Sequence, residues 1–120
     1  ASMMRVVPCC VDLVFVLIFA AIGRMSHGLD LLGILATAWP FLLACLGAWV
    51  VLGVLGDRGY GARAAVVSWL VTWLGGLGIR LLAGDTAQGA FVVVAGIALA
   101  VLLFGWRGVH RLVRRGRASA

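Results

Sequence analysis

The sequence contains no lysine and no glutamate, and its charge rests on ten arginines and four aspartates. Charged residues make up only 12% of the 120 residues, hydrophobic residues make up 64%, and the mean hydropathy is +1.16. Soluble domains carry roughly 25% charged residues, so this chain has too little polar surface for a water-soluble globule. The composition therefore predicts an integral membrane protein of one domain.

Several reactive motifs are absent as well. The chain has no HExxH, no GxSxG and no phosphate-binding loop with a lysine. Its three cysteines, Cys9, Cys10 and Cys45, form no CxxC pair. His27 and His110 are expected on opposite sides of a membrane, where they could not ligate one haem iron. We expect a protein that is not an enzyme and that needs no cofactor and no metal.

Four apolar segments are long enough to cross a bilayer, which takes about 17 to 25 residues. They lie at roughly 6–23, 31–54, 65–82 and 90–106, and short connectors rich in glycine and aspartate separate them. Short connectors make neighbouring helices antiparallel. The prediction is an all-α membrane protein, a four-transmembrane-helix up-down bundle with both termini on the same side. Residues 1–106 form the transmembrane domain, and residues 107–120 form a basic cytoplasmic tail.

The distribution of arginine predicts the orientation. Eight arginines lie in the N-terminal segment, the connector between the second and third spans, and the tail, whereas two lie on the opposite side. Because cytoplasmic segments are enriched in basic residues, both termini are predicted to be cytoplasmic in the inner (plasma) membrane. The tail is expected to contact anionic lipid headgroups.

Small and polar residues recur at four-residue spacing along the third span: Ala64, Ser68, Thr72, Gly76 and Arg80. Small residues mark helix contacts in membranes, because lipid is as apolar as leucine. The simpler interpretation is a tight helix seam. The alternative is a narrow polar track lined by the two hydroxyls.

Asp12 is the one acidic residue within a predicted span. A carboxylate in the bilayer must be paired, protonated or close to water. Arg107, at the cytoplasmic end of the fourth span, is predicted at matching depth, with Arg5 and Arg111 as competitors. An ion pair between Asp12 and Arg107 is one hypothesis, and a protonatable relay at Asp12 is the other.

On the opposite side, Arg24, His27 and Arg80 are predicted at similar depth. Each could simply extend to lipid headgroups. The alternative is a shared site for an anion such as a carboxylate, a phosphate or a quinone oxygen.

Four stretches, "DLVFVLIFAAIGRMSHG", "TAWPF", "WLVTWLGGLGIR" and "FGWRG", occur in this order. Together they resemble a prokaryotic domain-of-unknown-function family of short four-helix integral membrane proteins, over roughly residues 11–108. The resemblance implies four spans and no nameable activity. It gives weight to Asp12, Arg24, His27, Pro40, Arg80, Trp106 and Arg107.

Three functions are compatible with these features. We place first a non-enzymatic subunit or scaffold that packs with other membrane helices, as a homo-oligomer or within a larger complex. An oligomeric transporter or channel for small solutes or ions, with the outer anion cluster, is the alternative. A surface binder of anionic lipid or nucleic acid through the tail comes third, and nucleic acid is not an expected partner.

Overall fold

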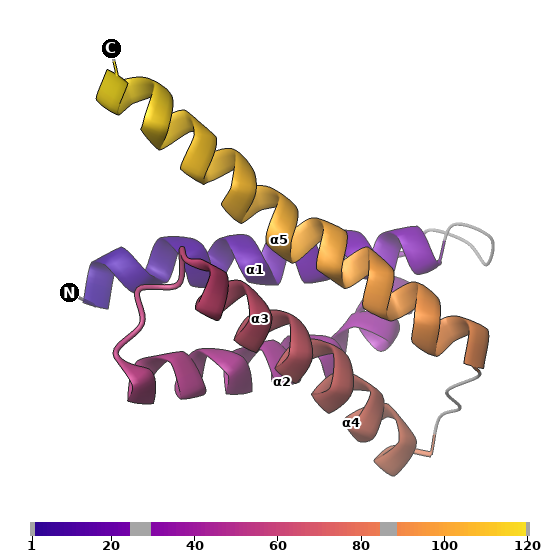
Figure 1. The fold of residues 1–120 in the computed structure, drawn as a ribbon. Coiled ribbons are helices and arrows are strands. Elements are labelled where there is room, and N and C mark those ends of the chain that lie inside the picture. The colour runs from indigo at the N-terminus through magenta and orange to yellow at the C-terminus, as the bar shows by residue number, and fades with distance from the viewer. Residues whose placement is uncertain (1, 25–29, 85–88, 120) are drawn as a thin grey trace.

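The computed structural model describes residues 2–24, 30–84 and 89–119. Within these ranges the chain is helical and contains no strand. The elements are α1 (Ser2–Gly23), α2 (Leu31–Leu55), α3 (Ala62–Leu70), a π-helical segment η1 (Val71–Gly75), α4 (Gly76–Leu82) and α5 (Gly89–Ser119). Segments α3, η1 and α4 follow one another without a break and form the third span (Figure 1).

The helix ends of α2 follow from local sequence. Asp30 caps its N-terminus by accepting a hydrogen bond from the Gly33 amide at 3.0 Å. Gly56 ends it in the left-handed region, with φ of 70°, and the Asp57 amide donates to the Leu52 carbonyl at 2.9 Å. This is the glycine-dependent helix stop in which the residue after the glycine bonds back to the last turn.

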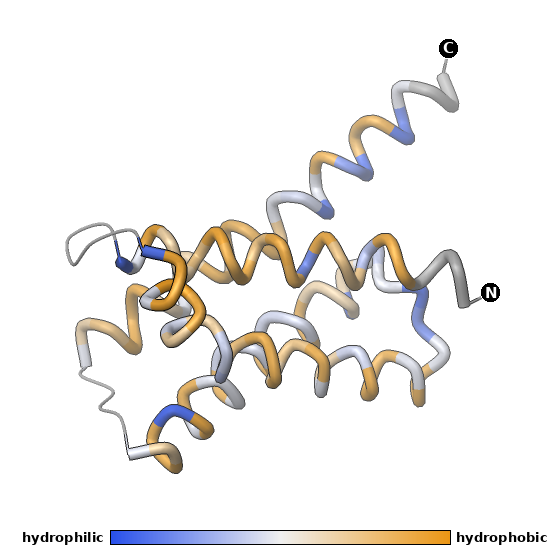
Figure 2. The backbone as a smooth tube through the Cα atoms, turned by 180° about the vertical axis from the view of Figure 1, so that it is seen from behind, coloured by the Kyte–Doolittle hydropathy of each residue, from blue (hydrophilic) through white to orange (hydrophobic). Residues whose placement is uncertain are grey.

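Four helical segments are long and apolar enough to cross a membrane: Val6–Gly23, Leu31–Leu55, Ala62–Leu82 and Gly89–Gly116. Figure 2 shows apolar residues along all of them, with hydrophilic residues gathered near helix ends and along the C-terminal part of α5. Large apolar side chains remain exposed on the outside of the bundle, as a lipid-facing surface requires. The predicted all-α, four-span membrane fold is confirmed.

The interior of the bundle combines an aromatic cluster with small residues. The rings of Phe19 and Phe41 meet edge to face with centroids 5.1 Å apart. Pro40, Ala44 and Ala48 of α2 are also buried. The small residues of α2 are therefore used within the chain, where they let the helices approach one another closely.

The predicted basic tail is the C-terminal part of helix α5. Helix α5 is continuous from Gly89 to Ser119, so the predicted boundary between residues 106 and 107 falls inside it. Its C-terminal part extends away from the other helices in Figure 1. The basic segment is therefore presented as a helical extension of the fourth span.

Candidate functional site: a buried ion pair joining four spans

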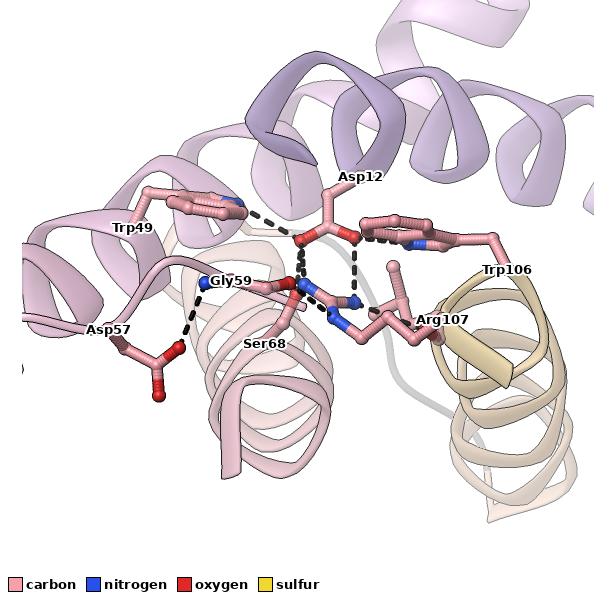
Figure 3. Close-up of polar contacts among 8 residues, drawn as sticks. Asp12, Trp49, Asp57, Gly59, Ser68, Trp106 and Arg107 are labelled. Atoms are coloured by element: carbon pink, nitrogen blue, oxygen red, sulfur yellow. Dashed lines mark hydrogen bonds and ion pairs between the residues drawn. The ribbon is translucent and has the colours of Figure 1, made fainter. Parts of the chain in front are cut away.

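Asp12 of α1 is fully buried, and its carboxylate accepts five hydrogen bonds (Figure 3). One oxygen, Oδ2, accepts from Trp49 Nε1 of α2 at 3.0 Å and from Ser68 Oγ of α3 at 2.9 Å. The other, Oδ1, accepts from Trp106 Nε1 of α5 at 2.8 Å. Arg107 supplies the remaining two donors. One carboxylate thus joins side chains from all four spans.

The Arg107 guanidinium binds this carboxylate in a two-pronged arrangement. Its Nη1 lies 2.9 Å from Asp12 Oδ1 and its Nη2 lies 2.8 Å from Asp12 Oδ2. Nε donates to the Gly59 carbonyl at 2.8 Å, and Nη1 also donates to the Leu103 carbonyl at 3.1 Å. The cation lies 4.5 Å from the centre of the Trp106 ring. Arginine suits this role because its planar fork matches a carboxylate.

The connection between α2 and α3 places the Gly59 carbonyl where it accepts from Arg107 Nε. Asp57 Oδ1 accepts from the Gly59 amide at 2.8 Å, and its Oδ2 pairs with Arg63 Nε at 2.9 Å. Gly59 has φ of 95°, and a Cβ there would run into the Trp49 ring. Glycine is therefore needed twice, for its backbone conformation and for the space beside the indole.

Charge near this connection favours the ionised form of Asp57. Burial acts to raise its pKa, but the hydrogen bond from the Gly59 amide and the bond and charge of Arg63 outweigh burial and lower the pKa below its usual value. The carboxylate that shapes the connection is thus stabilised as an anion.

The network compensates the energetic cost of burying the charges of Asp12 and Arg107. Two charges removed from water cost several kcal/mol each, and this cost is recovered only when geometry is good and the remaining hydrogen-bonding capacity is used. Here the charges cancel, the carboxylate takes five donors, and Arg107 is 4% exposed. The arrangement fixes how α1, α2, α3 and α5 meet.

The sequence alone did not assign the indole donors. Trp49 is not among the residues that the sequence singles out, Trp106 has weight only through the family resemblance, and Ser68 belongs to the predicted helix stripe. A signal was available, because a Trp N–H within a bilayer needs an acceptor and Asp12 is the one acid in the spans. Of the competing arginines, Arg111 lies along the α5 extension, and the Arg5 side chain lies outside the described part.

A second set of indole contacts joins the third span to α5. Trp69 Nε1 donates to the Gly96 carbonyl at 2.8 Å, and Trp73 Nε1 donates to the Val92 carbonyl at 3.0 Å. The two indoles stack with centroids 5.4 Å apart. A Cβ on Gly96 would lie 2.7 Å from the Trp73 ring. Gly96 therefore permits the close approach of α5.

The predicted polar stripe Ser68, Thr72 and Gly76 faces the interior. All three residues are buried. Ser68 donates to Asp12 and Gly76 lies against the Phe41 ring. The Thr72 hydroxyl lies beside the Cys45 thiol and makes no hydrogen bond of ordinary geometry among the described residues. The stripe lies in the seam between helices.

The candidate outer anion cluster is only partly described. Arg24 Nη2 pairs with Asp30 Oδ1 at 3.3 Å, and the Arg80 guanidinium lies 4.8 Å from the centre of the Phe91 ring. His27 lies outside the described residues. Arg24 and Arg80 therefore contact different residues, Asp30 and Phe91 respectively.

At the start of α2, the pKa of Asp30 is lowered, first by the amide of Gly33 and then by Arg24. Arg24 thus already has a carboxylate partner, which reduces what it could offer to an external anion.

No cluster of three or more histidine, cysteine or acidic residues able to hold a metal occurs in the parts of the chain that the structure describes. Cys9, Cys10 and Cys45 are free thiols.

Fold and site together define a small multi-pass membrane protein whose four spans are joined by one buried ion pair. The chain belongs to the family described as "Protein of unknown function (DUF3054)", whose model matches residues 9–110. The matched region includes both Asp12 and Arg107. No curated protein and no solved structure matches the chain.

Proposed function

We propose that this protein is a non-enzymatic subunit or scaffold that associates with other transmembrane helices, either its own copies or those of a larger complex. The observation that supports a non-enzymatic role is the closed network around Asp12. Its carboxylate is fully buried and faces donors from every span. A relay group or nucleophile must exchange its proton with water or substrate, whereas this carboxylate serves to hold helices together.

The same proposal places the protein in the inner (plasma) membrane with both termini cytoplasmic. The α2–α3 connection, with Arg58 and Arg63, belongs to the end of the bundle where Gly59 meets Arg107. The arginines of the α5 extension follow directly in sequence. This basic end is the one that the positive-inside rule assigns to the cytoplasm.

The proposal has a structural consequence for where partners bind. The buried small residues of α2 and α3, such as Ala44, Ala48 and Ala64, are occupied by packing within the chain, so a partner must use other small positions. Gly47, Gly78 and Gly105 fit, because a Cβ at any of them would meet no atom within 4 Å. A larger residue there leaves the protomer intact but keeps a partner helix away.

The test is native mass spectrometry of the full-length protein, extracted in mild detergent and in lipid nanodiscs. We expect a defined oligomer or a co-purifying membrane subunit. Gly47→Leu, Gly78→Leu or Gly105→Leu should reduce that association in at least one case. Val101→Leu, a conservative change at an exposed position of α5, is the matched control and should not. A monomer without partners in both media would contradict the proposal.

One observation favours a transporter or channel as the second candidate. Thr72 is a buried hydroxyl without a hydrogen bond of ordinary geometry among the described residues, and it lies in a π-helical segment. Such segments are rare and often occur at functional sites. Solute or ion flux into proteoliposomes that falls in Thr72→Val would favour this candidate over the scaffold, provided that Thr37→Val, at a hydroxyl of α2 that donates to the Gly33 carbonyl, leaves the flux unchanged.

A further inference from the structure

A groove runs along the face where the third span and α5 lie against each other. Its first part is an apolar hollow of about 340 Å³. Trp69 and Trp73 form one wall, and Gly96, Ile97 and Ala100 of α5 form the other. This part lies within the membrane-spanning length of both helices.

Its second part is larger and basic. A hollow of about 770 Å³ lies between the beginning of α3 and the extension of α5. Tyr60 and Phe104 line it together with Arg111, Arg114 and Arg115. In Figure 1 the C-terminal part of α5 leaves the bundle beyond the start of α3.

The two hollows lie one after the other along the same faces of α3 and α5. Ile97, Phe104 and Arg111 are spaced by seven residues, so they lie on the same face of α5. Ala65 and Trp69 are one turn apart on α3 and belong to the second and the first hollow, respectively. The rings of Trp69 and Phe104 meet edge to face at 5.9 Å, at the junction of the two parts.

The basic end carries more arginines than acids among the described residues. The described acids at this end are Asp12 and Asp57, and each already binds an arginine, Arg107 and Arg63 respectively. Helix α3 begins at Ala62, and its N-cap residue Gly61 supplies no side-chain hydrogen bond, so the positive end of the helix dipole adds to the positive charge of the arginines. Arginine side chains suit phosphate because the guanidinium can donate two parallel hydrogen bonds.

We propose that the α3–α5 groove binds one molecule of an anionic phospholipid. Its phosphate lies at Arg111 and Arg114, and an acyl chain follows the groove past Phe104 to Trp69 and Ile97. The dimensions agree, because 14 residues from Ile97 to Arg111 span about 21 Å of helix. One leaflet offers about 15 Å of hydrocarbon and several ångströms of headgroup region. This site is independent of the proposed association with other helices.

The headgroup arm of the test is a titration of full-length protein in detergent with phosphatidylglycerol, followed by native mass spectrometry. We expect saturation at one lipid per chain, with phosphatidylcholine retained much more weakly. Arg111→Gln and Arg114→Gln should each weaken binding about fivefold, and the double variant about thirtyfold. Both residues are exposed, so the fold should persist, which circular dichroism verifies. Arg58→Gln removes an exposed arginine outside the groove and should have no such effect.

The acyl-chain arm uses Ala100→Phe, which fills the apolar hollow, against Val94→Phe, which adds the same bulk at an exposed position outside it. We expect only Ala100→Phe to weaken binding of the phospholipid. Inorganic phosphate, tested alone by thermal shift, should give little stabilisation.

Four outcomes would overturn the proposal. They are equal retention of the neutral lipid, equal loss in Arg58→Gln, full stabilisation by inorganic phosphate, and displacement of the lipid by a short oligonucleotide at physiological salt. The last would assign the basic end to nucleic acid.

Discussion

Replacing Asp12 by asparagine should be among the most damaging single changes to the bundle. The amide keeps the shape of the side chain but brings an NH2 donor to a place where five donors converge. Arg107, 4% exposed, would keep its charge without a counter-charge. Removing one member of a buried ion pair costs about 3–5 kcal/mol, which is a large part of the 5–15 kcal/mol that typically separates folded from unfolded protein.

The partner change, Arg107→Gln, should cost less. The Asp12 carboxylate would retain its bonds from Trp49, Ser68 and Trp106, which still compensate part of its charge. We therefore expect a loss of about 2–3 kcal/mol, below the usual cost of breaking a buried pair. In the double variant neither charge is present, so the loss should fall short of the sum of the single losses by about 2 kcal/mol.

The assay is reversible unfolding in mixed micelles, with the free energy of unfolding obtained for wild type, both single variants and the double variant. The control is the pair Asp57 and Arg63, in which the Arg63 side chain is 60% exposed, and Asp57→Asn and Arg63→Gln should couple by at most about 1 kcal/mol. If the losses of the Asp12 and Arg107 variants add to within about 0.5 kcal/mol, the two side chains are not energetically coupled, and the stabilising ion pair is refuted. That result would leave Asp12 as a group with another role.

Two further predictions concern packing and pH. Gly96→Ala should destabilise the fold by about 1–3 kcal/mol, because its Cβ would press on the Trp73 ring. Gly105→Ala is the control, since a Cβ there meets no atom within 4 Å, and it should be neutral or slightly stabilising. Thermal denaturation measures both. The lowered pKa of Asp57 means that its contribution to stability is complete above its unfolded pKa of about 4 and is lost as pH falls through its folded value. Acid titration of thermal stability should therefore be less steep in Asp57→Asn than in wild type; equal slopes would contradict the role given to Arg63.

The four spans could be predicted because two local signals agree along the whole chain. Apolar runs of membrane-spanning length are separated by connectors such as "GDRGYGAR", and the structure ends α2 at Leu55, one residue from the predicted boundary. The end of the fourth helix was harder to predict. Hydropathy stops the span near Trp106, but arginine is a good helix former and Gly108 does not interrupt α5, so the helix continues through Ser119.

The partnership of Asp12 and Arg107 could be predicted from depth alone, since both lie near the same end of the bundle. Depth does not give the rotation of each helix about its axis, which packing decides. That rotation is what brings Trp49 and Ser68 to the carboxylate. The π-helical turn at Val71–Gly75 leaves no mark in the spacing of the stripe.

The polar contacts hold the two ends of the bundle unequally. At one end a fully buried carboxylate ties four spans together, and Arg107 is held from both the helix and the α2–α3 connection. At the other end, the pair between Arg24 and Asp30 is partly exposed and longer, and such pairs contribute little. The locked end also begins the basic groove, since Arg107 and Arg111 are one turn apart on α5. Through its bonds to Arg107, Asp12 anchors the turn of α5 from which the extension continues.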